Sequence, residues 1–317
     1  MIDVAQREEA VRNDSTRASH GAMLLRKVLS FFLHLLPRSA PEFIYKNLLT
    51  LSFLRNTTNN ILRKIIPRLI QIPEGNLLLN PNDPVVSGAL MLGVYEVTFT
   101  NLFREALRPG MTVIDIGANI GYYTLIASTR VGSAGKILAY EPEPENIAFL
   151  RATIIENNLS NVTVMQTALG EKSGIATLYC DPNNKGKHTM LPVLSNTPIT
   201  VPTTTLDASL DDCLQKKIDL IKIDTEGWEA KIFLGMQHTL TTHHPQIFFE
   251  FAPERIRQTG EDPQHLLDTL VSMGYIMECI DEHTETLLRI SDHSQYIHTL
   301  HGYDGYSNIR ATWKPKS

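Results

Sequence analysis

The segment VIDIGANIGYYT, residues 113–124, decides the fold of this chain. An apolar run ends at Asp115 and Gly117, and helical spacing of apolar residues then follows over residues 120–131. A strand, a glycine-rich turn and a helix in this order are typical of open α/β sheets, where ligands bind outside the carboxyl ends of the strands. Glycine in such a turn lets a ligand approach the backbone closely. The segment therefore predicts a ligand-binding turn at the edge of a parallel sheet.

Strand-like and helix-like segments continue to alternate on the carboxyl side of this turn. We expect strands at residues 113–117, 136–140, 162–168, 218–223 and 246–251, and helices at residues 120–131, 144–157, 229–240 and 264–273. Short β-like runs at 176–180 and 199–205 flank a polar loop, and residues 275–280 and 286–290 are expected to form a closing hairpin. The alternation predicts a Rossmann-like α/β domain with a mainly parallel sheet and helices on both faces.

The amino-terminal part of the chain has a different character. Residues 1–75 carry 11 Lys/Arg and 6 Asp/Glu, a net charge of +5. We expect a disordered tail over residues 1–20, a helical extension over 21–75, a turn-rich linker over 73–84 and the catalytic domain over 85–317. Amphipathic helices usually bury their apolar stripe against their own protein, which favours a cap on the catalytic domain. The alternative for residues 21–70 is peripheral contact with a membrane surface or a partner.

The overall charge and the longest apolar runs narrow the class of protein. The net charge of −5 argues against a nucleic-acid-binding protein. The apolar run at residues 22–37 is shorter than the roughly 20 residues that a membrane-spanning helix needs, and it contains Arg26, Lys27 and His34. The first 20 residues are polar and do not resemble a secretory signal. We therefore expect a cytoplasmic protein without a transmembrane helix.

The turn at residues 115–121 differs from the dinucleotide fingerprint. GxGxxG needs three glycines, whereas here Gly117 and Gly121 stand four apart with Asn119 between them. Asp115 precedes the first glycine, and a fixed negative charge suits a cationic ligand better than a pyrophosphate. The methionine moiety of S-adenosylmethionine carries an ammonium and a sulfonium, so this cofactor fits the turn. The alternative is a tight turn that binds no ligand.

A second acidic position follows the next expected strand. Glu141 ends the strand at residues 136–140, and a carboxylate there can accept hydrogen bonds from both hydroxyls of a ribose. Taken alone, Glu141 is equally consistent with an acid at the start of a helix. Together with the glycine turn, it indicates a nucleoside-binding site.

Further acids cluster at the ends of the later strands. In IDLIKIDTEGWE, residues 218–229, an apolar run leads to Asp224, and Glu226 and Glu229 follow. Glu250 ends the strand at residues 246–251, and His188 lies in the polar loop at 181–190. A carboxylate or a histidine within hydrogen-bond reach of a hydroxyl can remove its proton, so the candidates for a general base are Asp224, Glu226, Glu250 and His188. Alternatively, Glu226 and Glu229 cap the helix that follows.

Metal binding is a weaker prediction. The chain lacks the His/Cys spacing of a transition-metal site, and we expect no metal. The alternative is an oxygen-ligated magnesium ion at Asp224 and Glu250.

Several motifs in a fixed order resemble the FkbM family of S-adenosylmethionine-dependent methyltransferases. The resemblance covers about residues 88–255. The motifs are GVYEVTFTNLFREALRPG (93–110), VIDIGANIGYYT (113–124), AYEPEPENIAFLRATIIENNL (139–159), TALGEKSG (167–174), TTLDASL (204–210), IDLIKIDTEGWEAKIFLGM (218–236) and PQIFFEFAP (245–253). The resemblance implies a seven-stranded class I methyltransferase fold and, in most members, O-methylation. It does not extend to residues 1–75.

The resemblance also implies a role for individual residues. The methionine end of the cofactor would be lined by Asp115, Gly117, Asn119 and Gly121. Glu141 would hold the ribose, and Thr167 and Ala168 would lie near the adenine. Glu96 would sit near the cofactor loop, and Asp224 and Glu226 would face the methyl group and the acceptor.

The expected function is therefore S-adenosylmethionine-dependent O-methylation of a small molecule, sugar or glycan. One alternative is a nicotinamide-dependent oxidoreductase, against which the missing GxGxxG argues. Another is a catalytically inactive methyltransferase-like protein that binds a membrane surface or a partner through its basic helices.

Overall fold

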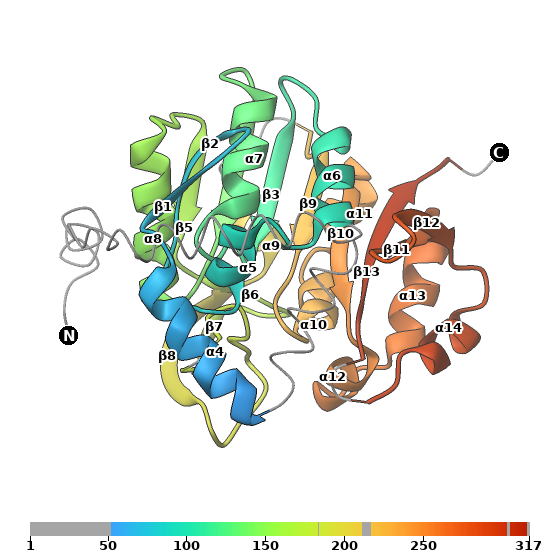
Figure 1. The fold of residues 1–317 in the computed structure, drawn as a ribbon. Helices are drawn as coiled ribbons and strands as arrows, with labels where there is room; N and C mark the ends of the chain where they lie inside the picture. Colours follow the sequence, from blue (N-terminus) through green and yellow to red (C-terminus); the bar gives the residue numbers. More distant parts are fainter. Residues whose placement is uncertain (1–51, 183, 211–216, 303–304, 316–317) are drawn as a thin grey trace.

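The computed structural model describes residues 52–182, 184–210, 217–302 and 305–315 (Figure 1). Their centre is an eight-stranded sheet in the order β12-β11-β13-β10-β9-β3-β4-β5. Its strands are β3 (Thr112–Ile116), β4 (Lys136–Tyr140), β5 (Val162–Met165), β9 (Leu220–Ile223), β10 (Gln246–Phe251), β11 (Tyr275–Asp281), β12 (Thr286–Arg289) and β13 (Ser307–Trp313). The strands from β5 to β10 run parallel, and β13, β11 and β12 complete the sheet in antiparallel pairing.

The predicted α/β fold is confirmed, with a difference at one end of the sheet. Seven strands, from β5 to β11, form the expected sheet, and β12 adds an eighth by pairing with β11. This pair is the closing hairpin expected from the sequence. Strand β13 was not predicted, although residues 308–313 of SNIRATW alternate between polar and apolar side chains as a half-buried strand does. It lies between β10 and β11, where Ile309 and Ala311 are fully buried.

Side-chain alternation on the central strand builds two apolar layers. Val113 of β3 packs on one face, in a cluster with Phe103 and Ile126. Ile114 and Ile116 pack on the opposite face, with the helices near the carboxyl end of the chain. The helices of the first face are α6 (Val97–Ala106), α7 (Tyr122–Val131) and α8 (Pro144–Glu156). The second group comprises α9 (Leu206–Leu210), α10 (Glu229–Leu234), α11 (Gln237–His243), α12 (Pro253–Gln258), α13 (Pro263–Ser272) and α14 (His293–Thr299).

The described part of the amino-terminal extension packs against the catalytic domain. Helix α4 (Ser52–Ile65) is followed by a hairpin of β1 (Leu69–Ile72) and β2 (Gly75–Leu78) and by the short helix α5 (Val86–Leu92). The expectation of helix up to residue 70 and of a linker from residue 73 was therefore wrong in this hairpin. Residues 1–51, which include the expected tail, lie outside the described residues.

Two features of the extension fix it in place. Leu62 and Ile65 of α4 are buried in one cluster with Leu77 and Val86. In the hairpin turn, Glu74 accepts hydrogen bonds from Arg104 at 2.9 Å and from Arg130 at 3.1 Å. The turn of the β1–β2 hairpin is thus held at the carboxyl-terminal end of α7.

A small second sheet lies below the carboxyl ends of the parallel strands. It consists of β6 (Ala168–Leu169), β8 (Thr197–Thr204) and β7 (Gly174–Cys180). The third expected strand, residues 162–168, is therefore divided between β5 of the main sheet and β6 of this one. The loop between β7 and β8 carries residues 184–190 to the edge of the main sheet.

Within the described ranges, no single helix is long and apolar enough to cross a membrane. One bent pair among them, α5 and α6 at 80°, meets that test by length and composition alone.

Candidate active site

A cavity of about 220 Å³ lies at the carboxyl ends of β3, β4, β9 and β10. It receives residues from the glycine turn, from the segment before α6 and from the β7–β8 loop. Ten of the twelve site residues expected from the sequence line it: Glu96, Gly117, Asn119, Glu141, Thr167, Ala168, His188, Asp224, Glu226 and Glu250. The other two, Asp115 and Gly121, lie directly behind the cavity wall.

The glycine turn is shaped by three residues with positive φ. Gly117, Asn119 and Gly121 have φ angles of 74°, 50° and 93°. A Cβ atom on Gly117 would lie 1.9 Å from the backbone oxygen of Asp224, so only glycine fits there. A Cβ atom on Gly121 would lie 2.7 Å from Leu150. Gly121 thus shapes the turn without lining the cavity.

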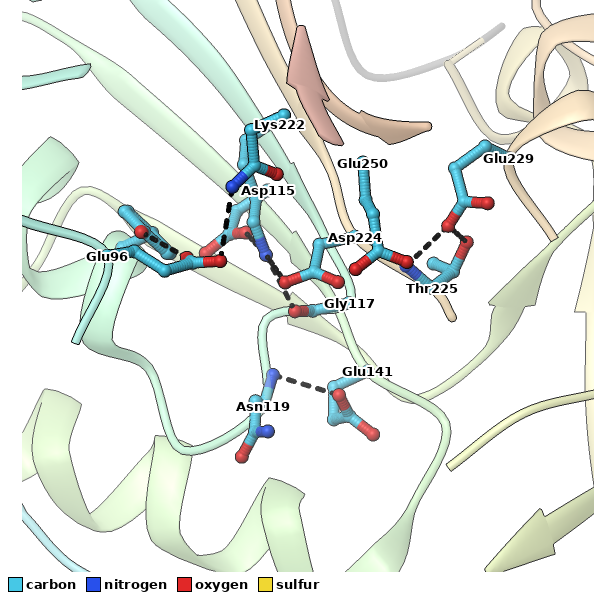
Figure 2. A network of polar contacts seen from close by, with 12 residues as sticks. Glu96, Asp115, Gly117, Asn119, Glu141, Lys222, Asp224, Thr225, Glu229 and Glu250 are labelled. Atoms are coloured by element: carbon cyan, nitrogen blue, oxygen red, sulfur yellow. Dashed lines mark hydrogen bonds and ion pairs between the residues drawn. The ribbon is translucent and has the colours of Figure 1, made fainter. Parts of the chain in front are cut away.

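Glu141 is held by the backbone of the glycine turn. The N–H of Asn119 donates to Glu141 Oε2 at 2.9 Å (Figure 2). The N–H of Glu143 donates to Glu141 Oε1, also at 2.9 Å. Burial nevertheless raises the pKa of Glu141 to about 7. The Asn146 side chain also hydrogen-bonds to this carboxylate, which keeps acceptor capacity for a further donor. The side chain is therefore oriented to accept a hydroxyl group of a ligand.

Asp115 lies in a different place from the one expected. Its side chain is fully buried on the α7 face of the sheet, where Thr124 donates a 2.6 Å hydrogen bond to Oδ2. Side chains alternate along a strand, so Asp115 shares the face of Val113 and points under the turn. The prediction that Asp115 lines the cavity is thus corrected: Asp115 supports the glycine turn from behind the cavity wall.

Lys222 connects Asp115 to the cavity, and the sequence analysis missed it. It stands beside Asp115 in the β3–β9 register and is 2% exposed. Its Nζ lies 3.8 Å from Asp115 Oδ1 and 3.4 Å from Asp224 Oδ2, and donates a 3.2 Å hydrogen bond to the Gly117 carbonyl (Figure 2). Burial alone lowers the pKa of Lys222, but the charges of Asp224 and Asp115 outweigh burial and raise it. The signal in the sequence was a single lysine inside an apolar strand.

Glu96 lies beside this lysine and lines the same cavity as the glycine turn. Tyr123 donates a 2.8 Å hydrogen bond to its Oε2, and Asn308 donates to Oε1 at 3.3 Å. Burial and the charge of Asp224 raise the pKa of Glu96 to about 7. Its backbone is left-handed, with φ of 41°, which turns the chain into α6.

The acids of β9 and β10 meet around a buried arginine. Arg255, 2% exposed, donates to Glu226 and, at 3.0 Å, to Glu250. Burial raises the pKa of Glu226 to about 7, and burial with the neighbouring acids raises that of Glu250 well above its usual range. The carboxylates of Asp224, Glu226 and Glu250 offer oxygens within 4.8 Å of one another. Since Arg255 already contacts two of these three groups, it supplies positive charge that a metal ion would otherwise supply.

His188 is unsuited to the role of general base. Its Nδ1 accepts a 3.1 Å hydrogen bond from the backbone N–H of Asp181, so this nitrogen is unprotonated and Nε2 carries the hydrogen of the neutral ring. Burial and the charge of Lys185 lower the pKa of His188 to about 4. Its ring thus presents a donor, not an acceptor, and the interpretation of His188 as a base is corrected.

The remaining expected residues divide between the cavity and its support. Thr167 and Ala168 line the cavity between β5 and β6, beside the indole of Trp228. Glu229 is fully buried and accepts hydrogen bonds from the N–H and the hydroxyl of Thr225, both at 2.9 Å. Glu229 therefore supports the turn of residues 225–227 that precedes α10, while Glu226 lines the cavity.

Comparison with known proteins shows where this chain has relatives. Residues 115–277 match the family model described as the methyltransferase FkbM domain. The chain is 28% identical to methyltransferase sdnD of Sordaria araneosa over 205 residues, which cover 54% of this chain and 77% of that protein. It is 26% identical to hexuronic acid methyltransferase AglP of Haloferax volcanii, over 46% of this chain and 58% of the relative. With 31-O-demethyl-FK506 methyltransferase FkbM of Streptomyces tacrolimicus it shares 34% identity, over 24% and 29% of the two chains.

Proposed function

Because the chain belongs to the FkbM family of S-adenosylmethionine-dependent methyltransferases, we propose that it methylates a hydroxyl oxygen of a small molecule, sugar or glycan. The observation that carries this proposal is one shared cavity. The glycine turn and Glu141 line one side of it, and the acids of β9 and β10 line the other. A nucleoside on the first side would therefore lie beside a hydroxyl on the second.

The residues on the first side suit S-adenosylmethionine. Glu141 is buried, is oriented by two backbone N–H groups and can accept a hydrogen bond from a ribose hydroxyl. Thr167 and Ala168 line the same cavity, and we assign the adenine to their side of it. Glu96 and Asp224 line the cavity near the turn, where their carboxyl groups can face the cationic sulfonium end.

The residues on the second side suit a hydroxyl acceptor. When bound, S-adenosylmethionine supplies an activated methyl group, whose carbon bonds to the acceptor oxygen as its bond to sulfur breaks. The protein must hold the hydroxyl in line with that group and exclude water, and positioning of this kind contributes about 7–11 kcal/mol. A carboxylate must also accept the hydroxyl proton.

Asp224 is the best candidate for this base. Glu226 and Glu250 are engaged by Arg255, and His188 presents only a donor. The side chain of Asp224 is 27% exposed, so a ligand can reach it, and Lys222 Nζ lies 3.4 Å from its Oδ2, which fixes the direction of the carboxylate. The acceptor proton would pass to an Asp224 oxygen as the new carbon–oxygen bond forms.

The relatives agree with oxygen as the acceptor atom. One relative is named for a hexuronic acid and another for the 31-O-position of FK506. Sugars and hydroxylated small molecules are therefore the first acceptors to test. The match spans only part of each relative, so the choice of acceptor belongs to this proposal.

The described part of the extension is best interpreted as a cap. Leu62 and Ile65 of α4 and Ile66 directly after it are buried, while Ile61 on the same helix is 48% exposed. Among the α4 side chains whose burial is described, the apolar residues other than Ile61 are thus buried against the protein itself. We propose that this helix covers the catalytic domain, in preference to lying on a membrane.

The test is methyl transfer from deuterated S-adenosylmethionine to a panel of hydroxyl acceptors, followed by mass spectrometry and NMR. The proposal expects a labelled methyl ether on at least one sugar or small molecule, and its loss in Asp224→Asn. Label found only on nitrogen or carbon, with the same dependence on Asp224, would refute O-methylation.

A further inference from the structure

A buried lysine joins the two sides of the cavity. Lys222 comes from β9, the strand that leads to Asp224. It donates a hydrogen bond to the carbonyl of Gly117, which follows the neighbouring strand β3. Its Nζ also lies 5.1 Å from the ring centroid of Tyr123, whose hydroxyl donates to Glu96. One ammonium group thus contacts the cofactor turn, the proposed base and the ring that holds Glu96.

The position of this lysine is costly to the fold. The rest of β9, Leu220, Ile221 and Ile223, is apolar and fully buried. A buried ammonium loses its hydration and is tolerated only when other groups pair with it. An apolar side chain would satisfy the strand without this cost, because replacing a buried ion pair by packed apolar residues is often neutral or stabilising. The lysine therefore calls for an explanation beyond packing.

The charges around Lys222 suggest what it does. Asp115 and Asp224 lie within 4 Å of its Nζ, and Glu96 acts on it from the other side. The charge of Lys222 acts on Asp115 and on Glu96, and its Nζ pairs with Asp224. Without it, these acids would attract any cation that enters the cavity, and the Gly117 carbonyl would lose its donor.

We propose that Lys222 is a positioning residue that holds the Gly117 carbonyl and the Asp224 carboxylate together. Its charge also limits the preference of the site for the cationic cofactor over the product, whose sulfur is uncharged. This inference rests on the proposed function. Its consequence is a charge balance. The site accepts the sulfonium of the cofactor, but Lys222 limits how much more tightly it binds the sulfonium than the thioether of the product. Asp224 is therefore not drawn away from the acceptor toward the sulfonium.

The competing explanation is that Lys222 only neutralises buried Asp115. In that case its removal weakens the fold and lowers the affinity for both ligands equally. The ratio of the two dissociation constants separates the explanations, because the ligands differ in charge at sulfur alone.

The experiment measures binding of S-adenosylmethionine and S-adenosylhomocysteine to the full chain by calorimetry. The variants are Lys222→Met, which keeps the length and removes the charge, and Lys222→Arg, which keeps the charge. Lys231→Met is the matched control. Lys231 lies on α10, pairs with Glu171 and Glu261, and does not line the cavity.

In Lys222→Met, loss of the bond to Gly117 should raise the Kd of S-adenosylhomocysteine by about tenfold or more. The ratio of the product Kd to the cofactor Kd should rise by about threefold or more, since Asp115, Asp224 and Glu96 lose their shared cation. Lys222→Arg should return this ratio toward that of the wild type. Lys231→Met should leave both constants unchanged.

Equal weakening of both ligands in Lys222→Met, with an unchanged ratio, would overturn the proposal. If Lys222→Met does not fold, the double variant Asp115→Asn/Lys222→Met is used, because it removes both charges of the buried pair. Its ratio of dissociation constants is then compared with that of the single variant Asp115→Asn. An unchanged ratio in that comparison overturns the proposal in the same way. A wild-type chain that binds neither ligand would instead refute the proposed function.

Discussion

The backbone N–H of Asn119 donates a 2.9 Å hydrogen bond to the carboxylate of Glu141, and this contact joins the glycine turn to the end of the neighbouring strand. The left-handed backbone of Asn119, with φ of 50°, directs this N–H toward the carboxylate. The side chain expected to hold the ribose is therefore oriented before any ligand enters.

Removal of the Glu141 charge should weaken nucleoside binding strongly. Glu141→Gln keeps the size of the side chain but replaces one carboxylate oxygen by an amide NH2 group. That group then faces a backbone N–H, either that of Asn119 or that of Glu143, and two donors cannot form a hydrogen bond. Loss of charge-assisted hydrogen bonds costs about 1.5–3 kcal/mol, which raises the Kd of S-adenosylhomocysteine by about 10- to 100-fold. Calorimetry measures this change. Glu254→Gln, at an exposed glutamate paired with Arg257, is the control and should bind normally; equal affinities of the two variants would argue against a ribose role.

Binding should also depend on pH near neutrality. Burial raises the pKa of Glu141 to about 7, so the carboxyl group is largely protonated below that pH. Only the ionised form offers acceptors on both oxygens, and affinity for S-adenosylhomocysteine should therefore rise as the pH passes through 7, by up to about tenfold per unit below it.

The stability of the free protein should change in the opposite direction. The folded pKa of Glu141 is raised above its ordinary value of 4.5, so between these values the folded state binds more protons than the unfolded state. The contribution of this group to stability is complete below about pH 4.5 and is lost as the pH rises through 7. Urea unfolding from pH 5 to 8 should show a shallower decline in Glu141→Gln than in the wild type. A parallel decline in both proteins would contradict the raised pKa.

Alanine substitutions at two glycines should distinguish the effect of backbone strain from the effect of a steric clash. Gly117 and Gly110 have φ angles of 74° and 83°, but a Cβ atom would lie 1.9 Å from the Asp224 oxygen at Gly117 and would have no neighbour within 4 Å at Gly110. Gly110→Ala should cost about 1–2 kcal/mol of stability and bind S-adenosylhomocysteine normally. Gly117→Ala should cost clearly more and abolish binding. Chemical denaturation and calorimetry give both values, and similar behaviour of the two variants would exclude the proposed close approach.

The buried arginine should matter far more than its exposed neighbour. Arg255→Met leaves Glu226 and Glu250 without their cation, and breaking a buried pair in this way costs about 3–5 kcal/mol. Arg257→Met removes an ion pair whose side chains are 46% and 43% exposed, which costs at most about 1 kcal/mol. Urea unfolding compares the two variants. A small loss in Arg255→Met would mean that the two glutamates are protonated and need no counter-ion.

Local patterns in the sequence were sufficient to predict that the glycine turn and Glu141 meet at one edge of the sheet. Gly117, Asn119 and Glu141 each follow directly on a buried strand, so their positions at the carboxyl edge could be inferred without knowing distant contacts. The side chain of Asp115 could not be placed in this way. Its direction depends on the alternation of β3, which turns it toward Thr124 of α7.

The acceptor side depends on contacts between distant parts of the chain. Lys222 and Gly117 are 105 residues apart, and Asn308 reaches Glu96 from 212 residues away. Arg255 follows β10 in a segment, PERIRQ, that carries charges of both signs, and its pairing with Glu226 is visible only in three dimensions. The unpredicted strand β13 brings Asn308 to this region. Such contacts arise from sheet order, which local periodicity does not specify.

The most direct test of the central claim is calorimetric titration of the full chain with S-adenosylhomocysteine and, separately, with NADH. The account predicts that one S-adenosylhomocysteine binds per chain, that Glu141→Gln weakens this binding, and that NADH does not bind. Tight binding of NADH without binding of S-adenosylhomocysteine would contradict it.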